Sequence, residues 1–247
     1  MDVVTGVDGL RPEHGPIFVV VGVFDGLHRG HAYLLKHLVD EARRRSAQPT
    51  VITFDAHPDE VIRGSAPPLL IHPDERLERL AAAGVVVTVV QHFDDAVRRT
   101  PYDAFVGQIQ AATSLAGLLM TPDAAFGFER RGTPDALAAL GRDRDFDVVV
   151  VPPFTLGGRA VRSSEIRSAI AVGDLAGAAE LLGRPVTLRG ELRDGSMDFG
   201  WPLALPRDGT YRSRVGGVEG RITIADGRAS LLADTPASGP VEVELLA

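Results

Sequence analysis

Five short apolar runs recur along the first 151 residues, and they constrain the fold more than any other feature of this sequence. Their residues are mostly β-branched and continuous rather than alternating, which is typical of strands buried on both faces of a parallel sheet. The runs span residues 17–23, 50–54, 85–90, 116–120 and 147–151. The preceding residues 1–16 contain no comparable run, so we expect them to form a loosely ordered lead-in.

Helical patterns lie between these runs. Apolar residues follow a helical period at 29–45, and an acidic start and a following glycine bracket the pattern at 74–83. At 100–101 and 133–134 a Thr-Pro pair predicts a helix N-cap followed by proline at the first helical position, and Gly141 is expected to end the second of these helices. Strands that alternate with helices predict an α/β fold with a Rossmann-like, doubly wound parallel sheet.

The character of the sequence changes near residue 185. Two short helices are expected first, one that begins with hydroxyl caps at 163–170 and one at 174–182 that Gly183 closes. Glycine and aspartate then become frequent, and short alternating segments predict a small antiparallel sheet or partial barrel at 186–192, 210–215, 220–224, 229–232 and 241–246. We therefore expect two domains, 1–185 and 186–247, of which the second is marginal as an independent fold.

Residues 19–31 join the first predicted strand to the first predicted helix through a glycine-rich turn. The glycines let a ligand approach the backbone, and the helix start offers free N–H groups and a partial positive charge. His28 and His31 lie three residues apart at this helix start, where their imidazoles can donate to phosphate oxygens. Doubly wound sheets bind ligands beyond the carboxyl ends of their strands, so the stretch predicts a site for a phosphate chain.

Composition excludes several other classes of function. The formal net charge of −7 argues against a general nucleic-acid or anionic-membrane binder, and no apolar run approaches the roughly 20 residues of a membrane span. Cysteine is absent, which excludes disulfides, a cysteine nucleophile and thiolate metal sites. Lys36 is the only lysine, and no P-loop motif is present. The start of the chain has no signal-peptide pattern, so we expect a cytoplasmic protein without nucleic-acid or membrane partners.

The stretch 22–31 reads G-x-F-D-x-x-H-x-G-H. It closely resembles the signature of the nucleotidyltransferase superfamily whose phosphate-binding motif is written HxGH. The resemblance implies that His28 and His31 are catalytic and reach the phosphates of a nucleoside triphosphate. It implies nucleotide-binding roles for Gly22, Val23, Phe24, Asp25 and Gly30. Zinc is a poorer interpretation, because a zincin-like helical pair needs i, i+4 spacing with an acidic partner, so no metal-ligating side chains are predicted.

Residues 53–58 point to one branch of this superfamily. They read T-F-D-A-H-P and resemble the T-F-[DE]-P-H-P stretch of the bacterial FAD synthetases, also called riboflavin kinase/FMN adenylyltransferases. Ala56 replaces the family proline, which loosens the loop. The resemblance implies acceptor-binding roles for Phe54, His57 and Pro58.

A third segment follows the fourth predicted strand. It resembles the [DN]-F-x-F-G segment of the same family through Asp123, Phe126 and Gly127. Ala124 replaces the first phenylalanine, and Thr121 stands where a glycine usually precedes the segment. The resemblance implies that Asp123 binds the nucleotide and that Phe126 binds the acceptor.

A fourth segment, residues 162–167, reads R-S-S-E-I-R and resembles the S-S-T-x-I-R motif of the family. Arg162 and Ser164 depart from it. Helix-start N–H groups and hydroxyls can hold phosphates, so Arg162, Ser163 and Ser164 are expected to bind the nucleotide. Arg167 is expected to be catalytic, since its guanidinium can grip the leaving pyrophosphate with two parallel hydrogen bonds. With the bridge-like residues 173–185, the resemblance covers about residues 15–185.

The resemblance decays after residue 185. The family's kinase module carries G-F-P-T-A-N, in which the threonine and asparagine help to hold the metal–nucleotide. The aligned residues 200–205 read G-W-P-L-A-L, so Leu203 and Leu205 stand at these two places, and leucine cannot coordinate a cation. The tail is also too short for a complete kinase barrel. We interpret 186–247 as a degenerate, barrel-like remnant without kinase activity.

The resemblance implies an FMN adenylyltransferase that transfers AMP from ATP to FMN, giving FAD and pyrophosphate, with Mg²⁺ held mainly by phosphates and water. A nucleotidyltransferase with another phosphorylated acceptor, or with CTP as donor, is the first alternative, because Ala56, Thr121 and Ala124 can reshape the pocket. A non-catalytic flavin or nucleotide sensor is the second. The sequence leaves the oligomeric state open, a homo-oligomer included.

Overall fold

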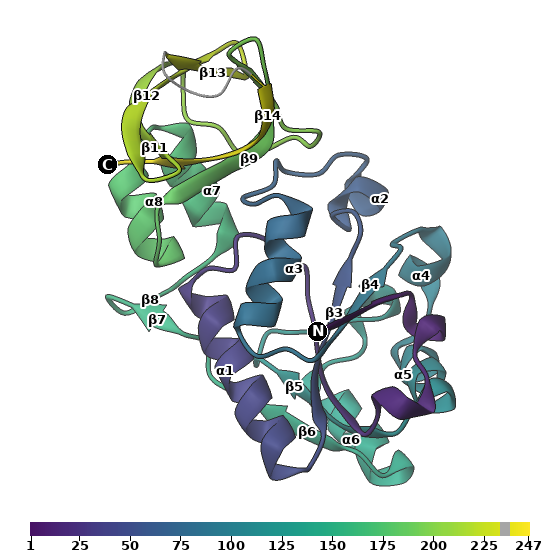
Figure 1. The fold of residues 1–247 in the computed structure, drawn as a ribbon. Coiled ribbons are helices and arrows are strands. Elements are labelled where there is room, and N and C mark those ends of the chain that lie inside the picture. The colour runs from purple at the N-terminus through teal and green to yellow at the C-terminus, as the bar shows by residue number, and fades with distance from the viewer. Residues whose placement is uncertain (233–237) are drawn as a thin grey trace. The chain divides into compact units, whose positions relative to one another are not determined.

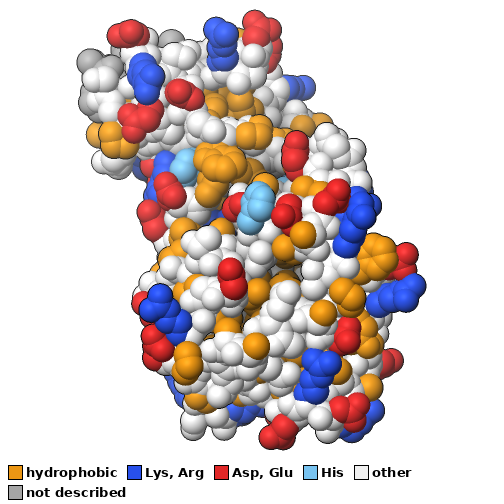
Figure 2. Space-filling model, turned by 90° about the vertical axis from the view of Figure 1, so that its right-hand side faces the viewer, with side chains coloured by type: hydrophobic (Ala, Val, Ile, Leu, Met, Phe, Trp, Pro, Cys, Tyr) orange, Lys and Arg blue, Asp and Glu red, His pale blue; other side chains and the backbone are white. Residues whose placement is uncertain are grey.

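The computed structural model describes residues 1–232 and 238–247, which form two compact units. The sheet unit comprises Met1–Phe24, His31–Pro67 and Leu77–Phe154, and the barrel unit comprises Asp25–Gly30, Pro68–Arg76 and Thr155–Ala247 (Figure 1). Charged side chains of both signs are interspersed on the face drawn in Figure 2. Among the described residues, no helix combines the length and the apolar character needed to cross a membrane.

Six parallel strands in the order β1-β4-β3-β2-β5-β6 form the core of the sheet unit. Their order reverses around β2, which pairs with β3 on one side and with β5 on the other. The five predicted strands are all present and the predicted α/β class with a parallel sheet is confirmed. The strands are β1 Asp2–Thr5, β2 Ile17–Val21, β3 Gln48–Phe54, β4 Val87–Gln91, β5 Leu115–Met120 and β6 Asp147–Val150.

The expectation of a loosely ordered lead-in is wrong. Residues 2–5 form the edge strand β1, and two 3-10 turns follow, η1 at Val7–Gly9 and η2 at Pro12–His14. Val4, Val7 and Leu10 are buried. Because β1 exposes three of its four residues, it lacks the continuous apolar run by which the other strands can be predicted.

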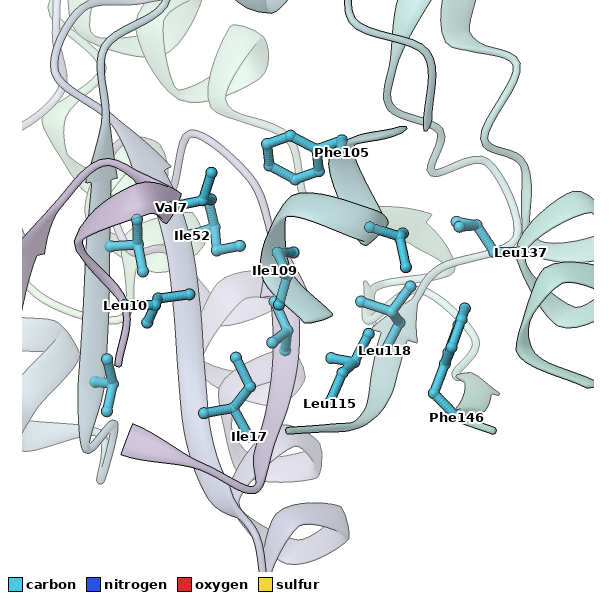
Figure 3. Close-up of a cluster of buried hydrophobic side chains, with 14 of the residues drawn as sticks. Val7, Leu10, Ile17, Ile52, Phe105, Ile109, Leu115, Leu118, Leu137 and Phe146 are labelled. Atoms are coloured by element: carbon cyan, nitrogen blue, oxygen red, sulfur yellow. The ribbon is translucent and has the colours of Figure 1, made fainter. Parts of the chain in front are cut away.

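Helices cover both faces of the sheet, with α1 and α5 on opposite sides (Figure 1). On the α5 side, Ile17, Ile52 and Leu118 from the strands meet Ile109 of α5 and Leu137 of α6 in one buried cluster (Figure 3). The helices that lie mainly in this unit are α1 Arg29–Arg44, α2 Asp59–Arg63, α3 Pro73–Ala82, α4 Asp95–Arg99, α5 Tyr102–Ala112 and α6 Pro134–Arg144, and a 3-10 turn, η3, spans Phe128–Arg130.

Helix α6 begins as predicted but ends later than predicted. Thr133 is its N-cap, and the Thr133 hydroxyl accepts the Ala136 N–H. The helix passes through Gly141 and ends at Asp145, which has a left-handed φ of 57°. Glycine is needed at 141 for space rather than termination, because a Cβ there would lie 2.3 Å from the Phe146 carbonyl oxygen.

The predicted N-cap of α5 is also one residue off. Pro101 occupies the N-cap position, and its preceding residue Thr100 closes the short helix α4 instead. The Thr100 hydroxyl donates to the Ala96 carbonyl. A Thr-Pro pair that follows directly on another helix can therefore end the first helix as well as begin the second.

The barrel unit contains two helices and a closed antiparallel barrel of six strands in the order β10-β13-β12-β11-β14-β9. All five predicted strand segments are present, and the short strand β10 completes the closure, so the barrel is not partial. The elements are β7 Thr155–Leu156, β8 Arg159–Ala160, α7 Ser163–Ala171, α8 Leu175–Leu182, β9 Val186–Arg193, β10 Ser196–Asp198, β11 Gly209–Val215, β12 Val218–Ala225, β13 Arg228–Leu232 and β14 Ser238–Leu245.

The division into compact units follows contacts rather than chain order. Helices α7 and α8 group with the barrel, as do residues 25–30 and 68–76. Contact grouping and sequence modules are different properties of a chain. The assignment of a nucleotidyltransferase domain to 1–185 and a kinase-like remnant to 186–247 stays a prediction.

Candidate active site

A cavity of about 680 Å³ opens at the carboxyl ends of the strands of the sheet unit. Its wall combines the end of β2 with residues that follow β3, β4 and β5. The strand order reverses here, and doubly wound sheets bind ligands at such a point. The predicted site residues that line the cavity are Gly22, Val23, Phe24, His31, Phe54, His57, Pro58 and Phe126.

Aromatic rings form two parts of the cavity wall. Phe54 and Phe93 meet edge to face with ring centroids 5.2 Å apart, and Phe105 and Phe126 meet likewise at 5.7 Å. Sequence reasoning missed Phe93 and Phe105. Phe93 follows the strand that pairs with β3, and that adjacency is the signal by which it could have been found. The apolar faces of such rings suit a flat aromatic ligand.

The turn after β2 brings a histidine to the cavity. His31 lies in the first turn of α1, and its ring centroid is 5.1 Å from that of Phe24. Phe24 is buried with a φ of 54°, a left-handed conformation that is costly for a bulky residue. The Thr53 hydroxyl donates to the Val23 carbonyl and ties this strained turn to β3.

Asp55 organises the loop after β3. Burial works against ionisation of this carboxyl, but hydrogen bonds from His92 and from the amides of Phe93 and Ala56 outweigh it and hold the pKa of Asp55 below its ordinary value. The Asp55 Oδ2 lies 2.6 Å from His92 Nδ1, and this hydrogen bond raises the pKa of His92. The pair therefore joins the ends of β3 and β4 beside Phe54 and Phe93.

In the barrel unit, Asp25 is the centre of a buried network. Both of its carboxylate oxygens accept the Leu70 N–H, at 2.8 and 3.1 Å, and Oδ2 accepts a hydrogen bond from Arg167 Nη2. Burial raises the pKa of Asp25 above its ordinary value, and the Arg167 charge opposes that rise. The Asp25 side chain thus anchors residues 25–30, which we call the phosphate loop after the role predicted for them from the sequence.

Arg167 is a partner of Asp25 in this structure. Its Nη2 pairs with the carboxylate, and its Nε donates to the Pro68 carbonyl at 2.8 Å. Its side chain is 16% exposed. Since a guanidinium has several donors, the pairing leaves others for a phosphate, so the predicted grip on pyrophosphate stays a prediction.

His28 is buried at 5% exposure. Burial, and then the nearby charge of Arg184, lower its pKa to about 4, so the imidazole is neutral at pH 7. Gly30 gives the ring its space, because a Cβ at that position would lie 3.1 Å from His28 ring atoms. Arg184, which sequence reasoning treated only as part of a bridge, donates to the Gly26 carbonyl at 2.9 Å.

The start of α7 contacts the phosphate loop through one hydroxyl. Ser163 Oγ donates to the Asp25 carbonyl at 3.1 Å. The expected hydroxyl caps are not formed, because the N-cap is Arg162 and it makes no side-chain cap hydrogen bond. The Ser164 carbonyl accepts the Ser168 hydroxyl within the helix.

Asp123 shapes the turn after β5. Its carboxylate accepts the Thr121 hydroxyl at 2.9 Å, and its carbonyl accepts Arg130 Nη2. It is not among the residues that line the cavity, whereas Thr121, Ala124 and Arg130 are.

Within the part of the chain that the structure describes, no group of three or more His, Cys, Asp or Glu side chains is arranged to hold a metal ion. A magnesium–nucleotide that enters as substrate needs few protein ligands, because its phosphates and waters fill most of the coordination shell.

Curated relatives share the sequence at about 30% identity. A bifunctional riboflavin kinase/FMN adenylyltransferase of Pseudomonas fluorescens is 30% identical over 208 residues, covering 83% of this chain and 67% of the relative. The protein of the same description from Escherichia coli K12 is 30% identical over 210 residues, covering 83% and 66%. The matches thus span about two thirds of the relatives' length.

A solved structure shares the fold. The crystal structure of a macrolide-efflux protein from Streptococcus pneumoniae matches with a TM-score of 0.85 at 21% identity, covering 99% of this chain and 90% of that chain. At this identity the match shows the fold alone. The sequence pattern of the FAD synthetase family matches residues 10–165, which is more than half of the chain. With the cavity at the strand ends and the relatives above, this match establishes that the chain belongs to the FAD synthetase family.

Proposed function

We propose that this chain is an FMN adenylyltransferase that forms FAD and pyrophosphate from ATP and FMN and has no riboflavin kinase activity. One observation carries the proposal: the aromatic-walled cavity at the strand reversal is lined by His31 and by the predicted acceptor residues Phe54, His57, Pro58 and Phe126. Family membership supports the substrate class.

In this proposal the phosphate of FMN attacks the α-phosphorus of ATP in line. A bond forms between an FMN phosphate oxygen and that phosphorus. The bond from the same phosphorus to the oxygen that bridges the α- and β-phosphates breaks, and pyrophosphate leaves. The nucleophile is already an anion, so no general base is required. The protein contributes by positioning the reactants and stabilising charge, which is how phosphoryl-type transfer is usually catalysed.

The residues divide this work. His31 at the cavity wall donates to the α-phosphate, and neutral His28 acts as a hydrogen-bond donor rather than a cation. Asp25 holds the phosphate loop, and Arg167, paired with Asp25, turns its remaining donors to the pyrophosphate. Mg²⁺, bound to the nucleotide, supplies further charge neutralisation.

The kinase-like tail supports a single activity. Leu203, which stands where the kinase motif has threonine, is 8% exposed, so it presents hydrocarbon to the protein interior. Such side chains cannot ligate a metal–nucleotide.

A different acceptor, or CTP as donor, is the second candidate within the same class. Thr121 and Ala124, which depart from the family pattern, both line the cavity, so side chains other than those of the pattern face a ligand on that side. A sensor without turnover is the third candidate.

The test is pyrophosphate release from a panel of donors and acceptors. We expect turnover with ATP and FMN, and about a hundredfold lower kcat for His31→Ala. His37→Ala, on the same helix outside the cavity wall, is the matched control and should keep the wild-type rate. Turnover with another pair but not with ATP and FMN would favour the second candidate, and tight binding without turnover would favour the third.

A further inference from the structure

We propose that the barrel, β9–β14, positions the phosphate loop through two separate chains of contacts and so serves the transfer reaction. The inference rests on the proposed function, because that function makes residues 25–30 part of the reaction site. All the residues involved belong to the barrel unit.

The first chain of contacts begins on β9. The Thr187 hydroxyl donates to both carboxylate oxygens of Glu75, at 2.9 and 3.2 Å. Glu75 Oε1 lies 3.8 Å from Arg184 Nη2. Arg184 in turn donates to the Gly26 carbonyl at 2.9 Å and to the Leu27 carbonyl at 3.4 Å. Thr187 and Glu75 are 6% and 2% exposed, so this chain is shielded from water.

The turn that this chain holds is strained. Leu27 has a φ of 37°, a conformation that L side chains rarely adopt, and it follows Gly26, whose φ of 82° costs a glycine little. Strained turns persist only where the surroundings over-determine them. Arg184 donates hydrogen bonds to two successive carbonyls of the turn, and His28 is the next residue after them.

The second chain of contacts begins in the segment between β10 and β11. The Leu69 N–H donates to the Pro202 carbonyl and the Ala204 N–H donates to the Leu69 carbonyl, both at 2.7 Å. The next amide, that of Leu70, donates to the Asp25 carboxylate. The barrel segment therefore fixes Leu69, and the adjacent residue Leu70 holds the Asp25 carboxylate.

The two chains of contacts favour a positioning role for the barrel over a role in stability alone. A buried pair such as Glu75 and Arg184 adds little net stability compared with a well-packed apolar core, but it defines one geometry. The first chain of contacts runs from a barrel residue to the Gly26–Leu27 turn of the phosphate loop. The second runs from a barrel residue to Asp25.

The experiment compares Thr187→Val with the matched barrel variant Thr210→Val, which removes an exposed hydroxyl from β11. Amide hydrogen exchange is followed in peptides that cover residues 25–30 and, as a measure of barrel integrity, in β12. Loss of a buried hydrogen bond to a carboxylate should speed exchange at 25–30 about tenfold in Thr187→Val and lower kcat about tenfold, with little change in KM. Thr210→Val and the hydroxyl-retaining Thr187→Ser should keep wild-type values.

Ala204→Pro tests the second chain, because it removes the amide that donates to Leu69, and it should also speed exchange at 25–30. If Thr187→Val does not fold, Glu75→Gln takes its place, since it keeps the shape and loses the charge that faces Arg184. Wild-type exchange and kcat in the variants of both chains would overturn the proposal. Absence of FAD formation by the wild-type protein would instead overturn the proposed function, and the exchange comparison would still report on positioning.

Discussion

Among single residues, His28 has the environment that bears most directly on chemistry. Burial and the Arg184 charge lower its pKa to about 4. A neutral imidazole donates one hydrogen bond and accepts another without adding a positive charge. The motif in the sequence suggests two similar histidines, but His28 is buried beside an arginine and His31 lines the cavity. We therefore expect the two to make different contributions to the reaction.

The lowered pKa of His28 predicts a pH-dependent stability. In the unfolded chain this histidine titrates near its ordinary value of about 6.5, so below that pH the unfolded state binds a proton that the folded state does not. Stability should fall as pH drops from about 6.5 to about 4, by up to about 3 kcal/mol, and the contribution should then level off. Urea unfolding at a series of pH values measures it. His28→Gln should flatten this part of the profile and His37→Gln should not, and an equally steep profile in His28→Gln would contradict the prediction.

The buried pair of Asp25 and Arg167 predicts strong coupling. Arg167→Met leaves the carboxylate buried without its cation, which should cost about 3–5 kcal/mol of unfolding free energy. The double variant Asp25→Asn, Arg167→Met should recover much of that loss. A double-mutant cycle measures the coupling, and a single Arg167→Met variant as stable as wild type would refute it. If Arg167 also grips pyrophosphate, the double variant will be stable yet slow.

At the scale of elements, loops after neighbouring strands build the cavity. Phe54 ends β3 and Phe93 follows β4, and the bond between Asp55 and His92 joins the two loops. Parallel pairing of β3 with β4 brings these residues together although they are about 40 positions apart. The aromatic wall of the cavity is thus a property of strand order rather than of one motif.

This arrangement predicts the effect of Phe93→Ala. Removal of the ring deletes part of the cavity wall and the edge-to-face pair with Phe54, so the KM for FMN should rise about tenfold while kcat changes less. Steady-state kinetics with FMN varied at saturating ATP measures it. Val86→Ala, an exposed site at the opposite end of β4, is the control. An unchanged KM in Phe93→Ala would exclude this wall from acceptor binding.

At the scale of the whole molecule, the chain joins a parallel α/β sheet to a closed antiparallel barrel. The family pattern matches only residues 10–165, and the barrel lies beyond it. The barrel closes without the polar residues of the kinase motif, because its strands bury alternate apolar side chains such as Leu188, Ile222 and Val243. Closure of the barrel therefore does not depend on those polar residues.

Leucine at positions 203 and 205 predicts that riboflavin and ATP yield no FMN, because leucine cannot hold a metal–nucleotide. Separation of flavins by chromatography after prolonged incubation measures this directly. The same preparation should convert FMN and ATP to FAD, which serves as the internal control. FMN formation from riboflavin at a rate similar to FAD formation would show that the tail retains kinase activity.

Much of the local structure could be predicted because it depends on short-range signals. The Thr133 cap and the end of α8 at Gly183 follow from backbone chemistry within a few residues. Predictions failed where a distant contact decides. Ser163 bonds to Asp25 rather than capping α7, and β1 depends on pairing with β4.

The sequence by itself determined the alternation of buried strands and helices, and with it the parallel sheet and the location of the first motif at a strand end. These follow from periodicity and from the conformational limits of glycine and proline, which are local properties. Only the tertiary structure decided that Phe93 and Phe105 complete the cavity and that Arg167 pairs with Asp25. It also decided that Glu75 contacts both Thr187 and Arg184. Contacts between residues far apart in sequence depend on strand order and burial, and no local pattern encodes them.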